Sequence, residues 1–219
     1  MSGVTAPSGP KAPRWAWWVA TGFGSGYLRP ASGTWGSLAA VGAWLPLCWL
    51  AARASKLLLG NLVPLDARGR RWLEAGLLVP QFLMFGAAVV MTWIAVKASD
   101  HVVHETGDKD PSYIVADEWA GQWWALWPVT PTVLLFGFAP RSASEGAYGL
   151  HPAALMTLVL GIPFLLFRLF DIWKPWPCFQ IQALPGGQGV VADDVVAGLY
   201  AMPLVWLGLA TVSIIFGGR

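Results

Sequence analysis

The stretch 167–177 reads FRLFDIWKPWP and closes a long apolar run. It places Arg168, Asp171 and Lys174 three residues apart, so a helix would carry all three along one side. Ionisable groups at the edge of an apolar segment are costly without partners and often mark a functional site. A local ion pair, with a lysine whose charged end reaches water, is the alternative interpretation. The acidic clusters elsewhere in the chain favour a site.

The composition indicates a membrane protein. Of the 219 residues, 56% are hydrophobic and 12% are charged, and the mean hydropathy is +0.54. Soluble domains usually carry about 25% charged residues. The net charge of +2 argues against a nucleic-acid partner, and the two cysteines provide no disulfide framework. We expect residues 1–14, which are rich in Pro, Gly and Ser, to be a disordered tail, and residues 15–219 to form a single membrane-embedded domain.

Five apolar segments follow one another, each near the roughly 20 residues that a bilayer-spanning helix needs. The fold class that we predict is therefore all-α: a multi-helical integral membrane protein with about five transmembrane helices. Internal prolines are expected to kink these helices. The segments are 35–52, 73–97, 118–139, 152–173 and 195–216.

The order of the loops predicts that all chemically active groups meet on one membrane face. A glycine-rich loop precedes the first span, an acidic loop follows the second, and the loop 174–194 follows the fourth. With five spans, these three loops emerge on the same side and the two bland loops on the other. Lysines and arginines are equally numerous on the two sides, so the positive-inside rule does not decide the orientation.

The glycine-rich loop is a candidate phosphate-binding element, because glycines let backbone amides turn toward an anion. A re-entrant turn that needs close backbone packing is the alternative. The candidate substrate-binding residues here are Gly24, Ser25, Gly26, Thr34 and Ser37.

Paired acids open the third and fifth segments, where they could simply cap a helix N-terminus. Together with Asp171 they place five carboxylates near one face, too many to remain together without a cation. Carboxylate oxygens suit Mg²⁺ or Mn²⁺, and nearby cations make a phosphate the natural ligand. No zinc pattern is present, and His101 and His104 are interpreted as loop residues. The predicted metal ligands are Asp117, Glu118, Asp193 and Asp194.

Several phosphatase chemistries lack their residues in this chain. There is no CxxxxxR thiol nucleophile, no PSGH histidine signature and no DG…AR aspartate array. A water activated by a metal is the chemistry that remains.

Four blocks resemble the motifs of the phosphatidylglycerophosphatase A family. They read GFGSGYLRPASGTWGSLAA, DPSYIVADEWAG, FRLFDIWKPWP and GGQGVVADDVVAG, occur in the family's order and span residues 22–198. The resemblance implies Mg²⁺-dependent removal of the terminal phosphate of phosphatidylglycerophosphate at the cytoplasmic face of the bacterial inner membrane. Ser32 departs from the proline that the family commonly carries there, and the stretches 99–109 and 54–71 look enlarged.

The resemblance places the polar motif positions but not their individual roles. The catalytic residues that we assign are Asp171, Arg168, Lys174 and Asp110, with the two cations offsetting charge on the phosphate oxygens. A phosphatase for another lipid or polyprenyl phosphate is the enzymatic alternative. A small ion transporter is the non-enzymatic one, but it would want acids in the middle of the spans rather than at their ends.

Overall fold

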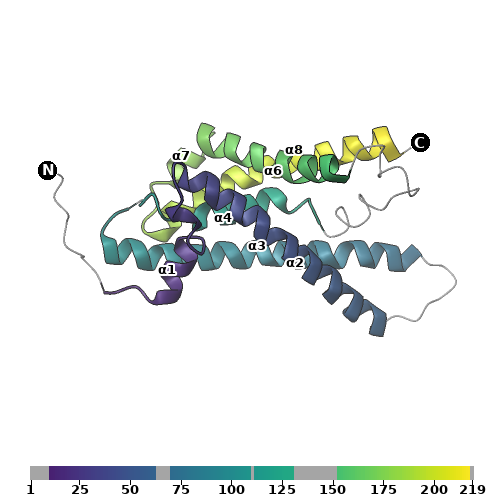
Figure 1. Ribbon diagram of the computed structural model, residues 1–219, viewed down its shortest axis with the longest axis horizontal. Helices are drawn as coiled ribbons and strands as arrows, with labels where there is room; N and C mark the ends of the chain where they lie inside the picture. Colours follow the sequence, from purple (N-terminus) through teal and green to yellow (C-terminus); the bar gives the residue numbers. More distant parts are fainter. Residues whose placement is uncertain (1–9, 63–69, 110, 131–151, 218–219) are drawn as a thin grey trace.

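The computed structural model describes residues 10–62, 70–109, 111–130 and 152–217. Within these ranges the chain forms helices and no strand. The elements, labelled as in Figure 1, are α1 (Arg14–Ala20), η1 (Ser25–Tyr27), α2 (Ser32–Leu62), α3 (Arg70–Thr106), α4 (Ala116–Leu126), α6 (Pro152–Trp173), α7 (Cys178–Ile181) and α8 (Gly187–Gly217).

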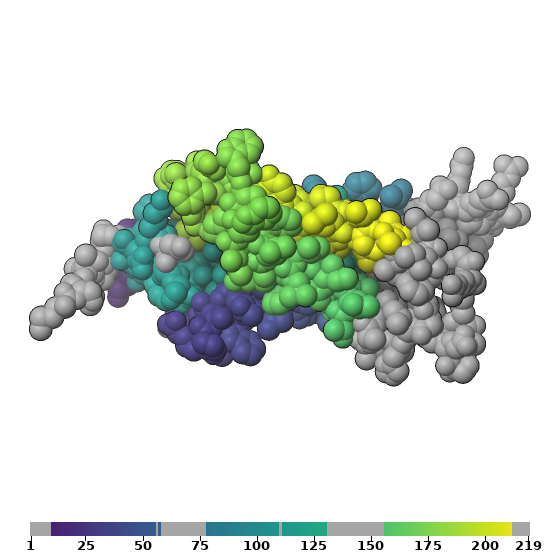
Figure 2. Space-filling model, turned by 90° about the horizontal axis from the view of Figure 1, so that it is seen from above, coloured from purple at the N-terminus to yellow at the C-terminus, as the bar shows by residue number. Residues whose placement is uncertain are grey.

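Four of these helices are long and apolar enough to cross a bilayer, which confirms a multi-helical membrane protein. Large apolar side chains cover their outer surfaces, as lipid contact requires: Phe82 is 70% exposed and Leu207 is 63% exposed. Figure 2 shows α6 (green) and α8 (yellow) lying side by side, with α2 (purple) next to α6. The candidate spans are Ser32–Ser55, Leu78–Thr106, Met156–Trp173 and Gly187–Thr211.

The third expected segment, 118–139, differs from the other four. Its described part is α4, a helix of 11 residues that would measure about 16 Å, against a hydrocarbon core of about 30 Å. Trp127 and Pro128 follow it, and residues 131–139 lie outside the described residues. Most of α4 is buried among the longer helices, so within the described residues it is an internal helix rather than a span.

Glycines allow α4 and α8 to pack backbone against backbone. A Cβ on Gly198 would collide with the carbonyl oxygen of Gly121, and a Cβ on Gly121 would collide with that of Asp194. Small residues at such crossings are typical of membrane helix pairs. This contact holds the part of α8 around Asp194 beside the first turns of α4, which brings their paired acids together.

Tryptophans of α4 lock it to the neighbouring helices. The Trp123 indole donates to the Ala40 carbonyl of α2 over 3.1 Å, and the Trp124 indole donates to the Thr92 hydroxyl of α3 over 3.0 Å. The tryptophans near the ends of the apolar runs behave differently, since Trp18 and Trp173 are 59% and 68% exposed. An indole at the membrane interface is expected to be exposed in this way.

Residues 10–14, which fall within the predicted tail 1–14, are among the described residues. The backbone N–H of Ala12 donates to the Glu105 carboxylate over 2.9 Å, and the Trp17 indole donates to the same oxygen over 3.0 Å. Glu105, in the last turns of α3, therefore holds α1 and the residues just before it against α3. Residues 1–9 lie outside the described residues.

Five helix ends gather at one end of the molecule. Figure 1 places the starts of α2, α4 and α8 and the ends of α3 and α6 in the same region, next to α1 and α7. The predicted convergence of the three polar loops is therefore present in the fold. It does not depend on α4 crossing the membrane, because α4 begins at this end as well.

Candidate active site

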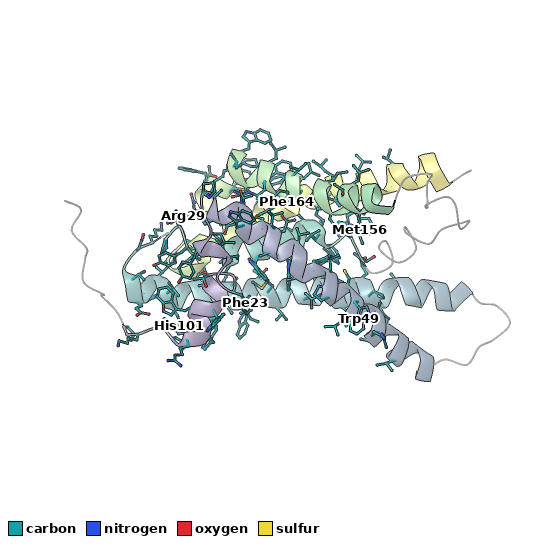
Figure 3. The ribbon with its side chains drawn as sticks, viewed as in Figure 1. Phe23, Arg29, Trp49, His101, Met156 and Phe164 are labelled. Carbon is teal, nitrogen blue, oxygen red and sulfur yellow. The ribbon has the colours of Figure 1, made fainter. Side chains whose placement is uncertain are left out.

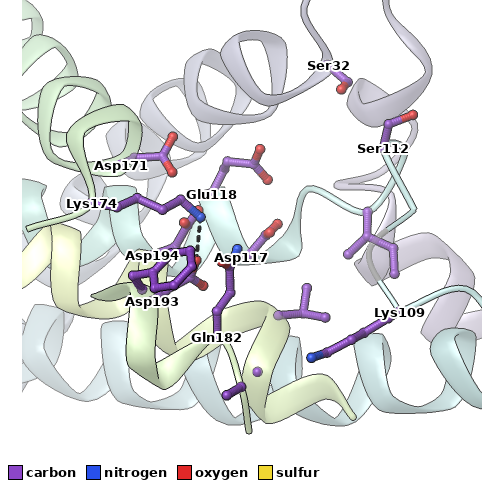
Figure 4. Close-up of a pocket in the computed structure, with 15 residues that line it drawn as sticks. Ser32, Lys109, Ser112, Asp117, Glu118, Asp171, Lys174, Gln182, Asp193 and Asp194 are labelled. Carbon is purple, nitrogen blue, oxygen red and sulfur yellow. Dashed lines mark hydrogen bonds and ion pairs between the residues drawn. The ribbon is translucent and has the colours of Figure 1, made fainter. Parts of the chain in front are cut away.

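A pocket of about 640 Å³ opens where the helix ends meet. Its wall combines the first residue of α2, the segment between α3 and α4, the start of α4, the end of α6, and the α7–α8 region (Figure 4). The wall is rich in charged groups for a surface next to apolar helices, which is typical of a site for a polar ligand. The polar lining residues are Ser32, Lys109, Ser112, Asp117, Glu118, Asp171, Lys174, Gln182, Asp193 and Asp194.

Three carboxylates meet at the centre of this pocket. One oxygen each from Asp117, Glu118 and Asp194 lies within 4.8 Å of the others. The first two come from the first turn of α4 and the third from α8, which the crossing at Gly121 holds in place. Asp194 is only 4% exposed. The sequence predicted all three as metal ligands, and the structure brings them together.

The trio is electrostatically crowded. Burial, followed by the charges of Asp194 and Asp171, raises the pKa of the Glu118 carboxyl to about 7, although a hydrogen bond with Asp117 acts in the opposite direction. Glu118 Oε2 is buried and has no hydrogen-bond partner among the described residues. A buried acceptor without a partner is expensive. A cation placed among the three carboxylates would relieve both the crowding and the missing contact.

Asp171 and Arg168 form an ion pair behind this cluster, 2.7 Å from Oδ2 to Nη1, with side chains 13% and 19% exposed. Asp171 lines the pocket, whereas Arg168 does not. A Cβ on Gly33 would collide with Glu118 Oε1 and lie 3.3 Å from Arg168 Nη1. The first turn of α2 thus approaches the site as bare backbone, where helix amides and the dipole favour negative charge.

Lys174 does not share a helix face with Asp171, which corrects the single-sided arrangement expected from the sequence. Helix α6 ends at Trp173, and Lys174 adopts φ 48° before Pro175. Its Nζ donates over 2.7 Å to Oδ2 of Asp193, as the dashed line in Figure 4 shows. Burial alone would lower the pKa of Lys174, but the hydrogen bond and the charge of Asp193 outweigh it and raise that pKa.

Asp193 stands apart from the other predicted metal ligands because of this pair. It is 3% exposed, and its second oxygen, Oδ1, is buried without a hydrogen-bond partner among the described residues. The three predicted residues of FRLFDIWKPWP therefore form two ion pairs, one within α6 and one between its end and α8.

The glycine loop lies at the same end of the molecule but outside the carboxylate pocket. Its backbone amides, from Gly22 to Leu28, are all bonded to carbonyls within residues 18–25, so none is left to cradle a phosphate. None of its predicted binding residues lines the pocket of the carboxylates. Gly24 and Ser25 face a second hollow, Gly26 abuts the carbonyl of Tyr113, Thr34 is half-buried, and Ser37 is buried and donates to the Gly33 carbonyl.

The remaining predicted residues have other positions. Asp110 lies outside the described residues. The two histidines are in the last turns of α3 rather than in a loop, because that helix continues to Thr106. His104 Nδ1 contacts the Asp100 carbonyl at 2.7 Å, and His101 packs edge-on against Trp15. Asp100 in turn accepts from the Gly187 amide over 3.1 Å, so this group joins α3 to α8.

Four polar residues of the wall escaped the sequence reasoning: Ser32, Lys109, Ser112 and Gln182. Lys109 and Ser112 lie in the acidic loop between predicted spans, and their closeness to Asp117 was the available signal. Gln182 gave no such signal, because it reaches the pocket through α7, a four-residue helix.

The sequence model of the family described as "Phosphatidylglycerophosphatase A" matches residues 18–209, which include every residue that lines the pocket. The chain belongs to the phosphatidylglycerophosphatase A family. Membership makes it a phosphoric monoester hydrolase, and it places the three-carboxylate pocket in an enzyme that acts on a phospholipid.

Individual relatives are similar in sequence over most of the chain. The phosphatidylglycerophosphatase A of Haemophilus influenzae is 30% identical over 189 residues, 86% of this chain and 85% of that protein. The Escherichia coli phosphatidylglycerophosphatase A is 27% identical over 189 residues, 86% of this chain and 80% of that protein. A Bacteroides thetaiotaomicron protein with the provisional name phosphatidylinositol-3-phosphatase is 28% identical over 187 residues, 85% and 89% of the two chains. No solved structure matches this chain at a significant level.

Proposed function

We propose that this protein removes the terminal phosphate of phosphatidylglycerophosphate, giving phosphatidylglycerol and inorganic phosphate, with Mg²⁺ as cofactor. The observation that carries the proposal is the meeting of Asp117, Glu118 and Asp194 in a pocket that Lys174 also lines, in a member of this family.

The residues fit a magnesium ion. Their donors are carboxylate oxygens without any sulfur or imidazole, the set that Mg²⁺ prefers. Glu118 Oε2 has no other partner among the described residues, and the crowding of negative charge favours a dication. Asp117, Glu118 and Asp194 would hold the ion, while Asp193 forms an ion pair with Lys174. When bound, such an ion polarises a phosphoryl oxygen and lowers the pKa of a water molecule.

The surrounding residues would bind and orient the phosphate. Lys174 presents its ammonium group to the pocket from the wall opposite Ser112, where it can offset charge on the phosphoryl oxygens (Figure 4). Asp171 lines the pocket and is the candidate to accept a proton from the attacking water. Arg168, which does not line the pocket, acts as a positioning residue that holds the Asp171 carboxylate through their ion pair.

The proposed substrate carries a second, singly charged phosphate group, the phosphodiester of its headgroup. Lys109 lies in the pocket wall across from Lys174, with its side chain directed toward the cavity (Figure 4). We assign the recognition of this phosphodiester to Lys109. A lipid with a single phosphate would leave that contact unused.

The proposed location is the bacterial inner membrane, with the pocket facing the cytoplasm. The four apolar helices support a membrane protein, and the gathering of the pocket-lining helix ends supports a site at one membrane face. The cytoplasmic orientation rests on the family's substrate, because the charge distribution favours neither side.

The second candidate substrate class is another lipid phosphate, and the Bacteroides relative favours it. A phosphate-release assay on detergent-solubilised protein separates the two. The panel contains phosphatidylglycerophosphate, phosphatidylinositol-3-phosphate, phosphatidic acid and a polyprenyl phosphate, each at the same surface concentration. We expect the highest kcat/KM for phosphatidylglycerophosphate. A preference of tenfold or more for any other member would overturn the substrate assignment, and no release from any member would overturn the phosphatase itself.

A further inference from the structure

A second hollow of about 840 Å³ lies beside the site, on the membrane-spanning part of α2. Ala39, Ala43 and Leu47 line it from α2 at helical spacing, and Trp119 and Trp123 line it from α4. The glycine loop completes it on one side, where Phe23 is 61% exposed and projects from the loop (Figure 3).

The hollow and the pocket share the same two helices. Glu118 lines the pocket, and the next residue, Trp119, lines the hollow. On α2, Ser32 lines the pocket and Ala39 lines the hollow, about 10 Å further along the helix axis. A molecule with a charged end in the pocket could therefore extend directly into the hollow.

The lining changes character along the membrane-spanning part of α2. The loop end has the Ser25 hydroxyl and Trp119, whose indole N–H is buried beside Gly22 without a hydrogen-bond partner among the described residues. The opposite end is apolar, with Ala43 and Leu47. Ala39 and Ala43 line the hollow, whereas the neighbouring Leu38, which does not line it, has a large side chain that is 44% exposed. The small side chains of Ala39 and Ala43 leave this space open.

We infer that the hollow holds one acyl chain of the phospholipid whose phosphate enters the carboxylate pocket. The ester end lies near Ser25 and Trp119, and the methyl end points past Ala43 toward Leu47. This inference rests on the proposed function. We choose an acyl chain as the occupant because lipid surrounds a hollow on a membrane span, and because the polar end of the hollow adjoins the phosphate pocket.

The role of the hollow is positioning rather than tight binding. A chain that leaves the bilayer for an apolar groove gains little hydrophobic free energy, since its surroundings were already apolar. A chain held in the groove, however, fixes the headgroup relative to the carboxylates. A misplacement of the reacting group by about 1 Å can cost about a hundredfold in rate.

Filling the hollow tests this directly. Ala43→Phe places a ring in the space, while Gly42→Phe places the same ring on an exposed position where a Cβ meets nothing within 4 Å. We compare kcat/KM for phosphatidylglycerophosphate with long chains and with four-carbon chains. Ala43→Phe should lower the long-chain value at least about tenfold more than the short-chain value, because only the long chain needs the groove. Gly42→Phe should change both values equally. Equal losses for the two substrates in folded Ala43→Phe would overturn the inference.

Photo-cross-linking gives a second measurement on the wild-type protein and does not need turnover. The probe is phosphatidylglycerol with a diazirine in the middle of one acyl chain, and the adducts are mapped by peptide mass spectrometry. Adducts concentrated on 39–47 and 119–123 support the inference. Adducts spread evenly over the outer faces of α3, α6 and α8 overturn it, even if the phosphatase activity is as proposed. A protein that labels at 39–47 but releases no phosphate would contradict the proposed function and not the groove.

Discussion

Replacing Lys174 by glutamine tests whether its pair with Asp193 is structural, chemical or both. The change leaves Asp193 as a carboxylate that is 3% exposed and has lost the ammonium partner of its Oδ2, while its Oδ1 has no hydrogen-bond partner among the described residues. Breaking a fully buried pair costs about 3–5 kcal/mol. The Lys174 side chain is 30% exposed, so water can partly replace it, and we expect a loss of roughly 2–3 kcal/mol. That loss corresponds to a melting temperature about 5–10 °C lower for a chain of this length.

The double variant Lys174→Gln/Asp193→Asn separates the two roles. Removing both charges leaves a neutral pair, so the melting temperature should return to within about 2 °C of wild type, a shift of under 1 kcal/mol. Phosphate release should stay about a hundredfold low, the cost of losing one preorganised contact to a developing charge. Both quantities are measured on the same detergent-solubilised preparation, by thermal melting and by phosphate release. A double variant with near-wild-type turnover would refute the chemical role, and a normal melting temperature for Lys174→Gln would refute the structural one.

Three further predictions concern single positions. Asp171→Asn should lower kcat at least about a hundredfold, as expected for a positioned proton acceptor. Its melting temperature should stay near that of wild type, because removing one of several crowded carboxylates offsets the lost ion pair with Arg168. More than a tenth of wild-type turnover would rule that role out. Lys109→Gln should raise KM for phosphatidylglycerophosphate about fivefold, the upper value for an exposed ion pair, and leave KM for phosphatidic acid unchanged. The control Lys11→Gln, outside the pocket, should change neither KM. Equal shifts for both lipids would contradict the assignment of Lys109. In a cysteine-free background, Leu57→Cys at the far end of α2, where Leu57 is 68% exposed, should react in intact cells with an impermeant thiol reagent, and Ser112→Cys should not. The opposite labelling would reverse the topology.

The sequence predicted the helical membrane fold and the meeting of its polar ends, because both follow from local patterns. Apolar length identified the spans, and the order of the loops placed the acids on one side. Asp117, Glu118 and Asp194 could be chosen as candidate ligands because ionisable groups at the edge of an apolar segment often mark a functional site. Their convergence within 4.8 Å depended on something less visible, the glycine crossing of α4 and α8.

What the sequence missed depends on tertiary contacts. The spacing of FRLFDIWKPWP suggested one helical face, but Lys174 leaves the helix at φ 48° and finds Asp193, 19 residues further on. Glycines in the first loop suggested free amides, but the loop's own carbonyls accept them all. Tryptophans of the 118–139 segment looked like part of a span, yet Trp123 donates a hydrogen bond inside the protein and ties a short helix to α2. Hydrophobic periodicity along the sequence does not predict such tertiary hydrogen-bond partners.

Phosphate release from phosphatidylglycerophosphate by chelator-treated protein, titrated with Mg²⁺, tests most directly whether the three carboxylates hold a metal needed for the reaction. Wild type should show no turnover without added metal and full turnover with it. Glu118→Gln keeps the shape of the side chain and removes its charge, and it should need at least about tenfold more Mg²⁺. Replacing a residue that only hydrogen-bonds to a metal ligand typically lowers metal affinity ten- to a hundredfold, and replacing a ligand itself should lower it at least as much. Asp100→Asn, outside the cluster, should titrate like wild type. Full turnover by the chelator-treated wild type without any added metal would contradict the magnesium site.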